Sequence, residues 1–159
     1  MRTVDIVNAL IFKKLNMSID TLEDRIVSQK EIYLLQHFGV DLGYNYKWYI
    51  YGPYSSELAN YMYDNLKYFK EMKFDYNLSI DCESKLRILN EVINYKNKGV
   101  SKESDWLELV SSLVFVMENN KNKSSSSDDE IIERLLQLKP KFTKQQVDSA
   151  YECIKGYGN

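Results

Sequence analysis

The side chains that carry most enzymatic chemistry are few in this chain and lie far apart in the sequence. His37 is the single histidine, and Cys82 and Cys153 are the two cysteines. A four-coordinate zinc site of cysteine and histidine cannot be assembled from so few ligands. We interpret His37, at the expected end of a helix, as a residue that meets the helix dipole or solvent. Asp81 and Glu83 flank Cys82 and should raise the pKa of its thiol, the reverse of what a nucleophile needs.

A run of acidic residues offers a candidate metal site. Asp128, Asp129 and Glu130 are consecutive, and Glu133 follows one helical turn later. A carboxylate-dependent metal enzyme would need Asp128, Asp129 and Glu133 to converge in a cleft. Acidic residues at the start of a helix also complement its dipole, and we favour that interpretation. We therefore predict no metal, no cofactor and no catalytic residue, and we do not expect an enzyme.

Charge is nearly balanced, with 21 Lys and Arg against 23 Asp and Glu, for a formal net charge of −2. Strong binding to DNA of any sequence requires clustered basic residues, so DNA binding is expected to be weak. Lys139, Lys141 and Lys144 have the spacing to contact phosphates. Without a stripe of arginine, we interpret them as part of a solvated loop.

Tyrosine is concentrated in one short segment, since eight of the 13 tyrosines lie between positions 44 and 68. Tyrosine and tryptophan bury a large area at low entropic cost and are enriched at the centres of protein interfaces. We predict that Tyr46, Tyr49, Tyr51 and Tyr54 form a partner-binding surface, while Trp48 faces the core. The alternative is a strand that is packed on both faces.

The aromatic segment ends in a corner with distinct backbone requirements. Gly52 allows a backbone conformation that is closed to other residues, and Pro53 fixes a turn. Ser55 can cap the following helix, whose buried face begins at Leu58. We interpret Gly52, Pro53, Ser55 and Leu58 mainly as an architectural motif, with contact to a partner as the alternative.

Hydrophobic spacing predicts the elements that must position these residues. The spacing indicates six or seven helices, at residues 3–15, 22 or 26 to 38, 56–70, 83–97, 101 or 104 to about 118, 131–138 and 144–155. The third helix should bury Leu58, Met62, Leu66 and Phe69. Capping-box spacing at Ser127 and Thr143 should start the last two helices, after a polar loop at 119–127. Residues 46–51 and 72–80 are expected to pair as a two-stranded β-ribbon, because the first is aromatic and the second alternates.

The fold class is therefore mainly α, with a short β-ribbon, and the chain is expected to form a single domain over residues 1–159. Residues 1–80 should form a winged-helix-like core, and residues 81–159 a helical subdomain that forms a bundle against it. Neither a signal peptide nor an apolar segment of membrane-spanning length is visible. Two isolated cysteines suit a reducing compartment, so we predict a cytoplasmic protein without a membrane partner.

Two segments resemble the core of the YwgA-like proteins, which are similar in style to the SocA-like proteins with a Panacea domain: Gln29-Lys30-x-Ile32-Tyr33-Leu34-Leu35-Gln36, and Tyr46-x-Trp48-Tyr49-x-Tyr51-Gly52-Pro53-Tyr54-Ser55-x-x-Leu58. The resemblance covers about residues 22–70. This chain has Val27-Ser28 where a basic pair is usual. The resemblance implies a winged-helix-like regulator or an antitoxin-like adaptor, associated with prophages or defence, and it brings no catalytic residues.

The sequence therefore predicts a non-enzymatic regulatory or adaptor protein that binds a partner protein, a toxin-like or regulatory target. The first alternative is a DNA-binding transcriptional regulator, and the second is the carboxylate-dependent metal enzyme. The nearly balanced charge favours the protein partner over DNA.

Overall fold

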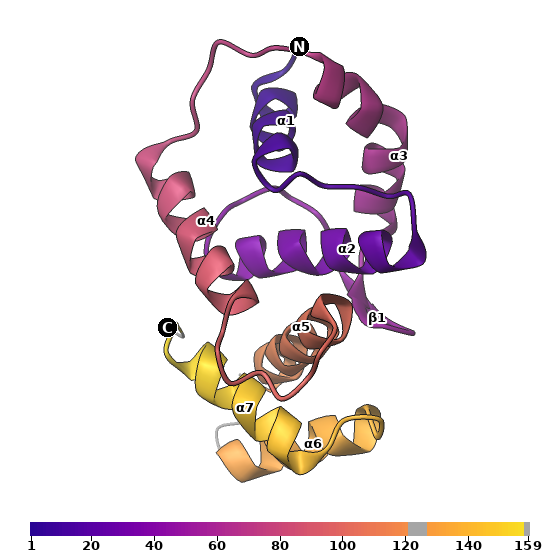
Figure 1. The fold of residues 1–159 in the computed structure, drawn as a ribbon, viewed down its shortest axis with the longest axis vertical. Coiled ribbons are helices and arrows are strands. Elements are labelled where there is room, and N and C mark those ends of the chain that lie inside the picture. Colours follow the sequence, from indigo (N-terminus) through magenta and orange to yellow (C-terminus); the bar gives the residue numbers. More distant parts are fainter. Residues whose placement is uncertain (121–126, 158–159) are drawn as a thin grey trace.

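The computed structural model describes residues 1–120 and 127–157, and these residues form seven helices and one two-stranded sheet (Figure 1). The prediction of a mainly helical fold with a short β-ribbon is confirmed. Most of the polar loop predicted at 119–127 lies outside the described residues. The elements are α1 (Thr3–Lys14), α2 (Leu22–His37), β1 (Lys47–Tyr49), β2 (Gly52–Tyr54), α3 (Ser56–Glu71), α4 (Ile80–Ile93), α5 (Glu103–Asn119), α6 (Asp128–Leu138) and α7 (Lys144–Lys155).

Short polar side chains begin five of these helices, because a side-chain oxygen can satisfy a backbone N–H that has no partner within the helix. Each accepts a hydrogen bond from the backbone N–H three residues further on, and they are Thr21, Ser55, Ser79, Ser127 and Thr143. Gln146 returns a bond to the backbone of Thr143 and completes the predicted capping box there. Local sequence signals thus placed the caps at Ser55, Ser127 and Thr143 correctly, whereas the cap at Ser79 was not predicted.

The β-ribbon is a tight hairpin, and the predicted strand pairing was wrong. β1 pairs in antiparallel fashion with β2, so that Lys47 lies opposite Tyr54 and Tyr49 lies opposite Gly52. Pro53 was expected to end the strand but belongs to β2. A two-stranded sheet has only edge strands, which tolerate a proline that cannot donate a backbone hydrogen bond.

The alternating segment 72–80 forms no strand. Residues 72–79 are irregular, and α4 begins at Ile80, three residues earlier than expected. Phe74 and Leu78 are partly buried against the core. Tyr76 and Ile80, by contrast, are exposed, so the alternation does not correspond to one buried face, and a period of two in the sequence was not sufficient to predict a strand.

Helix α5 is the centre of the hydrophobic core. It packs against α2, α4, α6, α7 and β2. In Figure 1, α2 crosses the middle of the molecule, with α1 and α3 on one side and α5, α6 and α7 on the other. The Trp106 indole N–H donates to the Val92 carbonyl, at 2.8 Å, and so joins α5 to α4. One cluster of buried apolar side chains extends from α1 to α7.

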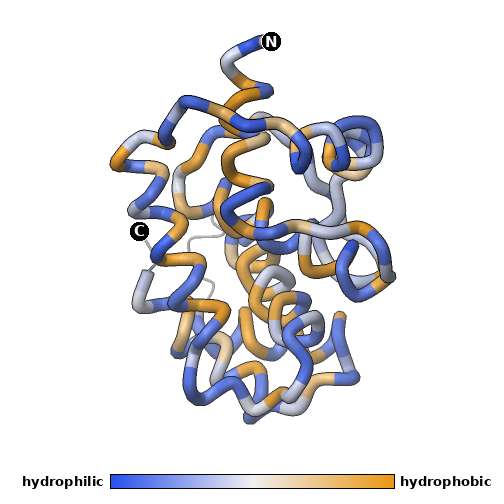
Figure 2. The backbone as a smooth tube through the Cα atoms, turned by 45° about the horizontal axis from the view of Figure 1, so that its top comes forward, coloured by the Kyte–Doolittle hydropathy of each residue, from blue (hydrophilic) through white to orange (hydrophobic). Residues whose placement is uncertain are grey.

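Helix α3 closes the core on the side of α1. Leu58, Met62, Leu66 and Phe69 are all buried, as the spacing predicted. Figure 2 shows apolar and polar segments alternating along most helices, the pattern of helices that bury one face. None of the described helices is both long and apolar enough to cross a lipid bilayer.

Candidate functional site: an aromatic pocket beside the hairpin

The tip of the hairpin exposes three large side chains in a row. Tyr49 is 58% exposed, Ile50 is 65% exposed and Tyr51 is 36% exposed. The ring of Tyr49 lies against that of Tyr54, with the ring centroids 5.4 Å apart. Three adjacent exposed apolar side chains at one turn form a patch, which differs from the isolated exposed residues of an ordinary surface.

Tyr46 and Trp48 lie on the inner side of the hairpin. The Tyr46 hydroxyl donates to the Gln29 carbonyl, at 3.0 Å, and its ring meets that of Tyr33 edge-on. Burial raises the pKa of the Tyr46 phenol well above its ordinary value. Trp48 packs on Phe115 of α5. Tyr46 therefore supports the hairpin from within, and three of the four tyrosines predicted to bind a partner lie together on the outer side.

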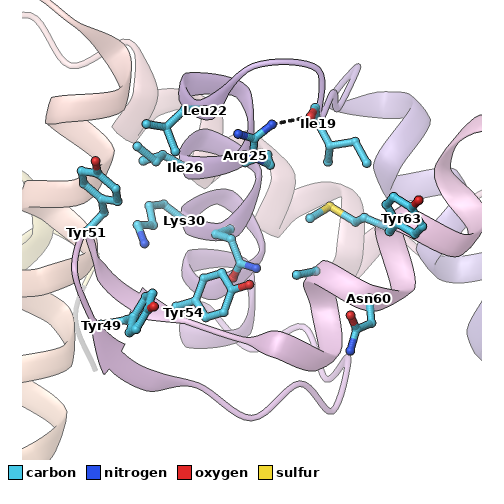
Figure 3. A pocket seen from close by; sticks show the side chains of 13 residues that line it. Ile19, Leu22, Arg25, Ile26, Lys30, Tyr49, Tyr51, Tyr54, Asn60 and Tyr63 are labelled. Atoms are coloured by element: carbon cyan, nitrogen blue, oxygen red, sulfur yellow. Dashed lines mark hydrogen bonds between the residues drawn. The ribbon is translucent and has the colours of Figure 1, made fainter.

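A pocket of about 390 Å³ lies between the hairpin, α2 and α3 (Figure 3). Tyr49, Tyr51 and Tyr54 line it from the hairpin, and Tyr63 lines it from α3. Most of its remaining wall is apolar and consists of Ile19, Leu22, Ile26, Ala59 and Met62. A cavity of this size with an aromatic wall is typical of ligand-binding sites.

Lys30 is a buried cation that lines this pocket. The residue is only 2% exposed, and its ammonium donates to the Pro53 carbonyl, at 2.6 Å. Burial lowers the pKa of Lys30 to about 7, although the Glu108 carboxylate partly offsets this by favouring the charged form. In Figure 3, the amino group points into the space bounded by the tyrosines of the hairpin.

Gln29 holds the corner that follows the hairpin. Its side-chain amide donates to the Ser55 carbonyl and accepts from the Ser55 backbone N–H, both at 2.9 Å. Gln29 and Lys30 thus bind the backbone of Pro53 and Ser55 from α2. The other members of the predicted motif, Gly52 and Leu58, are buried as well. These contacts join the two segments of the resemblance, Gln29–Gln36 and Tyr46–Leu58, in the folded structure.

Lys139 is buried, so the prediction that it belongs to a solvated loop was wrong. It is 7% exposed, and its ammonium lies 2.9 Å from the Glu108 carboxylate and donates to the Ile50 carbonyl, at 2.6 Å. Lys141 donates to the same carboxylate, at 2.7 Å. The available signal was Glu108 itself, because a charged residue inside the apolar run of α5 requires a buried partner.

The remaining candidates are not part of this pocket. The His37 imidazole lies 2.6 Å from the Glu118 carboxylate at the end of α2. Burial, and then Glu83 and Asp81, raise the pKa of the Cys82 thiol, in the predicted direction. Within residues 1–120 and 127–157, no three His, Cys, Asp or Glu side chains converge as metal ligands.

Comparison with known proteins found no match among protein-family models, curated proteins or solved structures. The resemblance to the YwgA-like proteins and the winged-helix-like character of the N-terminal half therefore stay predictions. The case for a function depends on the geometry of the hairpin and its pocket.

Proposed function

We propose that this protein is a non-enzymatic adaptor or regulator that binds a partner protein through the tip of its hairpin. The observation that carries the proposal is the patch of Tyr49, Ile50 and Tyr51, which are exposed side by side at one turn. Tyrosine anchors of this kind dominate the binding energy of protein interfaces. Burying such a patch removes apolar surface from water, which is the main driving force of association.

The hairpin is held rigidly, and this supports a binding role. Lys139 binds the Ile50 carbonyl at the tip, and Lys30 binds the Pro53 carbonyl in β2. Gln29 fixes Ser55 at the base. A surface that is ordered before binding loses less conformational entropy when the partner docks.

The charges around the hairpin favour a protein partner over DNA. Lys139 and Lys141 are paired with Glu108, and Lys144 is paired with Asp148. The lysine cluster that could have contacted phosphates is therefore bound to carboxylates of the same chain. A toxin-like or regulatory target and a cytoplasmic location are the finer parts of this proposal, and the resemblance of the sequence is what supports them.

Site-specific photocrosslinking in the cells of origin tests the proposal. A photoreactive phenylalanine replaces Tyr49 or Tyr51, and matched controls carry it at Tyr68 or Tyr76. Both control tyrosines are exposed, and neither lines the pocket. We expect one defined polypeptide to be crosslinked from the hairpin positions and absent from the control positions.

Variants then measure the energy of the contact. Tyr49→Ala and Tyr51→Ala should each weaken binding of the identified polypeptide by about 1–4 kcal/mol. Their melting temperatures should stay near that of the unmodified protein, because both rings are exposed. Tyr68→Ala should bind normally. Equal crosslinking from all four positions, or normal binding by both hairpin variants, would overturn the proposal.

A further inference from the structure

The pocket beside the hairpin has the size and the walls of a small-molecule site. Its volume of about 390 Å³ falls within the range of about 300–1,000 Å³ that is usual for such sites. Tyr49, Tyr51 and Tyr54 form one wall, with Ile26 and Met62 on the other sides. Flat aromatic walls favour a flat or apolar ligand body.

The charges that line the pocket all have one sign. Arg25 and Lys30 line it, and no acidic residue does. Arg25 is exposed at the rim, where it donates to the Ile19 carbonyl, at 3.0 Å. Lys30 is buried, and its ammonium donates to the Pro53 carbonyl, which leaves two N–H groups for other acceptors.

Among the described residues, no carboxylate forms a direct ion pair with Lys30. Glu108, the carboxylate that favours its charged form, is already in contact with Lys139 at 2.9 Å and Lys141 at 2.7 Å. Asp105 adds one carboxylate, 3.6 Å from Lys141. Lys30, Lys139 and Lys141 therefore have two carboxylates between them. In the part of the chain that the structure describes, Lys30 is the one of these three lysines that makes no direct ion pair.

We propose that this pocket binds a small molecule that carries one carboxylate on an aromatic or aliphatic body. The carboxylate would contact Lys30, and the body would lie against the tyrosines of the hairpin. A phosphate is a poorer fit, because a second negative charge in an apolar pocket would require more donors than Lys30 supplies. This pocket shares Tyr49 and Tyr51 with the proposed partner surface, whereas Lys30 is buried and belongs to the pocket alone, so a preference for acids that depends on Lys30 tests this proposal separately.

Protonation of Lys30 gives the site a distinctive pH dependence. The charged groups that act on its amine are Glu108 on α5 and Lys139 after α6. Arg25 on α2, the three phenols of the hairpin and Tyr63 on α3 are the other charged or titratable groups that line the pocket. Its pKa of about 7 means that the free site loses its charge near neutral pH. Affinity for a carboxylate should therefore fall as the pH rises from about 6.5 to 8.5, by up to about tenfold per pH unit above the pKa.

The test compares acids with their amides on the full chain. The probes are 3-phenylpropanoate, 4-phenylbutanoate, indole-3-acetate and octanoate, each titrated beside its primary amide. Protein NMR spectra follow the Ile26 and Met62 methyl groups. We expect at least one acid to shift these signals, and its amide to bind about tenfold more weakly. This comparison needs no substitution, so it does not depend on a variant that folds.

Two variants test whether Lys30 supplies the positive charge that binds the acid. Lys30→Met should remove the preference for acid over amide, whereas Lys144→Met, at an exposed lysine paired with Asp148, should retain it. The proposal is overturned if acids and amides bind alike, if the shifts lie outside the pocket, or if Lys30→Met still prefers acids.

Hexapeptides that end in phenylalanine, with a free or an amidated C-terminus, form a separate arm of the experiment. Binding of the free peptide without any small acid would assign the site to a chain end and would also overturn the proposal.

Discussion

A Cβ atom added to Gly52 would lie 2.5 Å from the hydroxyl oxygen of Ser112, so the buried Ser112 side chain would have to move. Gly52 also has a φ of 92°, which only glycine adopts without strain. Gly52→Ala should therefore lower the free energy of unfolding for two reasons, steric overlap with α5 and backbone strain. Gly43→Ala tests backbone strain alone, because Gly43 has a φ of 79° and a Cβ atom added there would meet no other atom within 4 Å.

Urea denaturation of the two variants separates these contributions. Gly43→Ala should cost about 1 kcal/mol, and Gly52→Ala should cost at least about 1 kcal/mol more. Ser112→Ala removes the overlapping oxygen and should recover part of the loss when combined with Gly52→Ala. Equal costs for the two glycine variants would show that the Ser112 hydroxyl does not oppose a side chain at position 52.

The second prediction concerns Lys139, which lies between the Glu108 carboxylate and the Ile50 carbonyl. Lys139→Met should lower the free energy of unfolding by about 3 kcal/mol, because one partner of a buried ion pair is lost and the tip of the hairpin loses its anchor. The matched control is Lys144→Met, at an exposed lysine of the same cluster, which should cost less than about 0.5 kcal/mol. Similar losses for both variants in thermal denaturation would argue against a buried pair.

Helix positions were predictable from the sequence because their signals are local. Thr143 and Gln146 are three residues apart and form the capping box that their spacing indicates. The stripe from Leu58 to Phe69 follows from the period of one helix. The partner of β1 was not predictable in the same way. An aromatic strand can pair with the residues just after a two-residue turn or with a distant segment, and the local sequence does not distinguish the two.

The site was only partly predictable because its supports come from distant parts of the chain. The exposed position of Tyr49 follows from alternation along a strand, whereas Ile50 and Tyr51 are exposed because they form the turn of the hairpin. Lys30 and Lys139 reach the hairpin from residues 23 and 89 positions away along the chain. Lys139 was predicted to lie in a solvated loop, and its burial depends on contacts with Glu108 and Ile50 that only the folded chain brings together. Lys30 is removed from water where α2 packs against β2. Glu108, which is buried inside the apolar helix α5, is a charge whose sequence context could have pointed to a buried partner.

The third prediction tests the register of α3. Leu66 is almost fully buried, so Leu66→Ala should lower the free energy of unfolding by about 2–5 kcal/mol. Leu138→Ala, at an exposed leucine that ends α6, should change it by no more than about 0.5 kcal/mol. Both are measured as shifts in the urea midpoint with an unchanged m-value. A midpoint that is unaffected by Leu66→Ala would place this side chain outside the core.

The last prediction concerns Glu31, a buried carboxyl on α2. Burial, and then the negative charge of Glu103, raise the pKa of Glu31 from 4.5 to about 8. In the unfolded chain, the same carboxyl loses its proton near pH 4.5. Between these two values the folded state binds more protons than the unfolded state, so this group makes stability fall as the pH rises, by at most about 1.4 kcal/mol per pH unit.

Glu31→Gln keeps the shape of the side chain but cannot titrate. The variant should therefore gain stability relative to the unmodified protein as the pH rises from 5 to 8, and urea denaturation at each pH unit measures that difference. Lys30 titrates in both proteins, so its contribution largely cancels in the comparison. Glu23→Gln, an exposed position on the same helix, should give a curve parallel to that of the unmodified protein. A parallel curve for Glu31→Gln would instead mean that the pKa of Glu31 is the same in the folded and the unfolded state, so that neither burial nor Glu103 raises it.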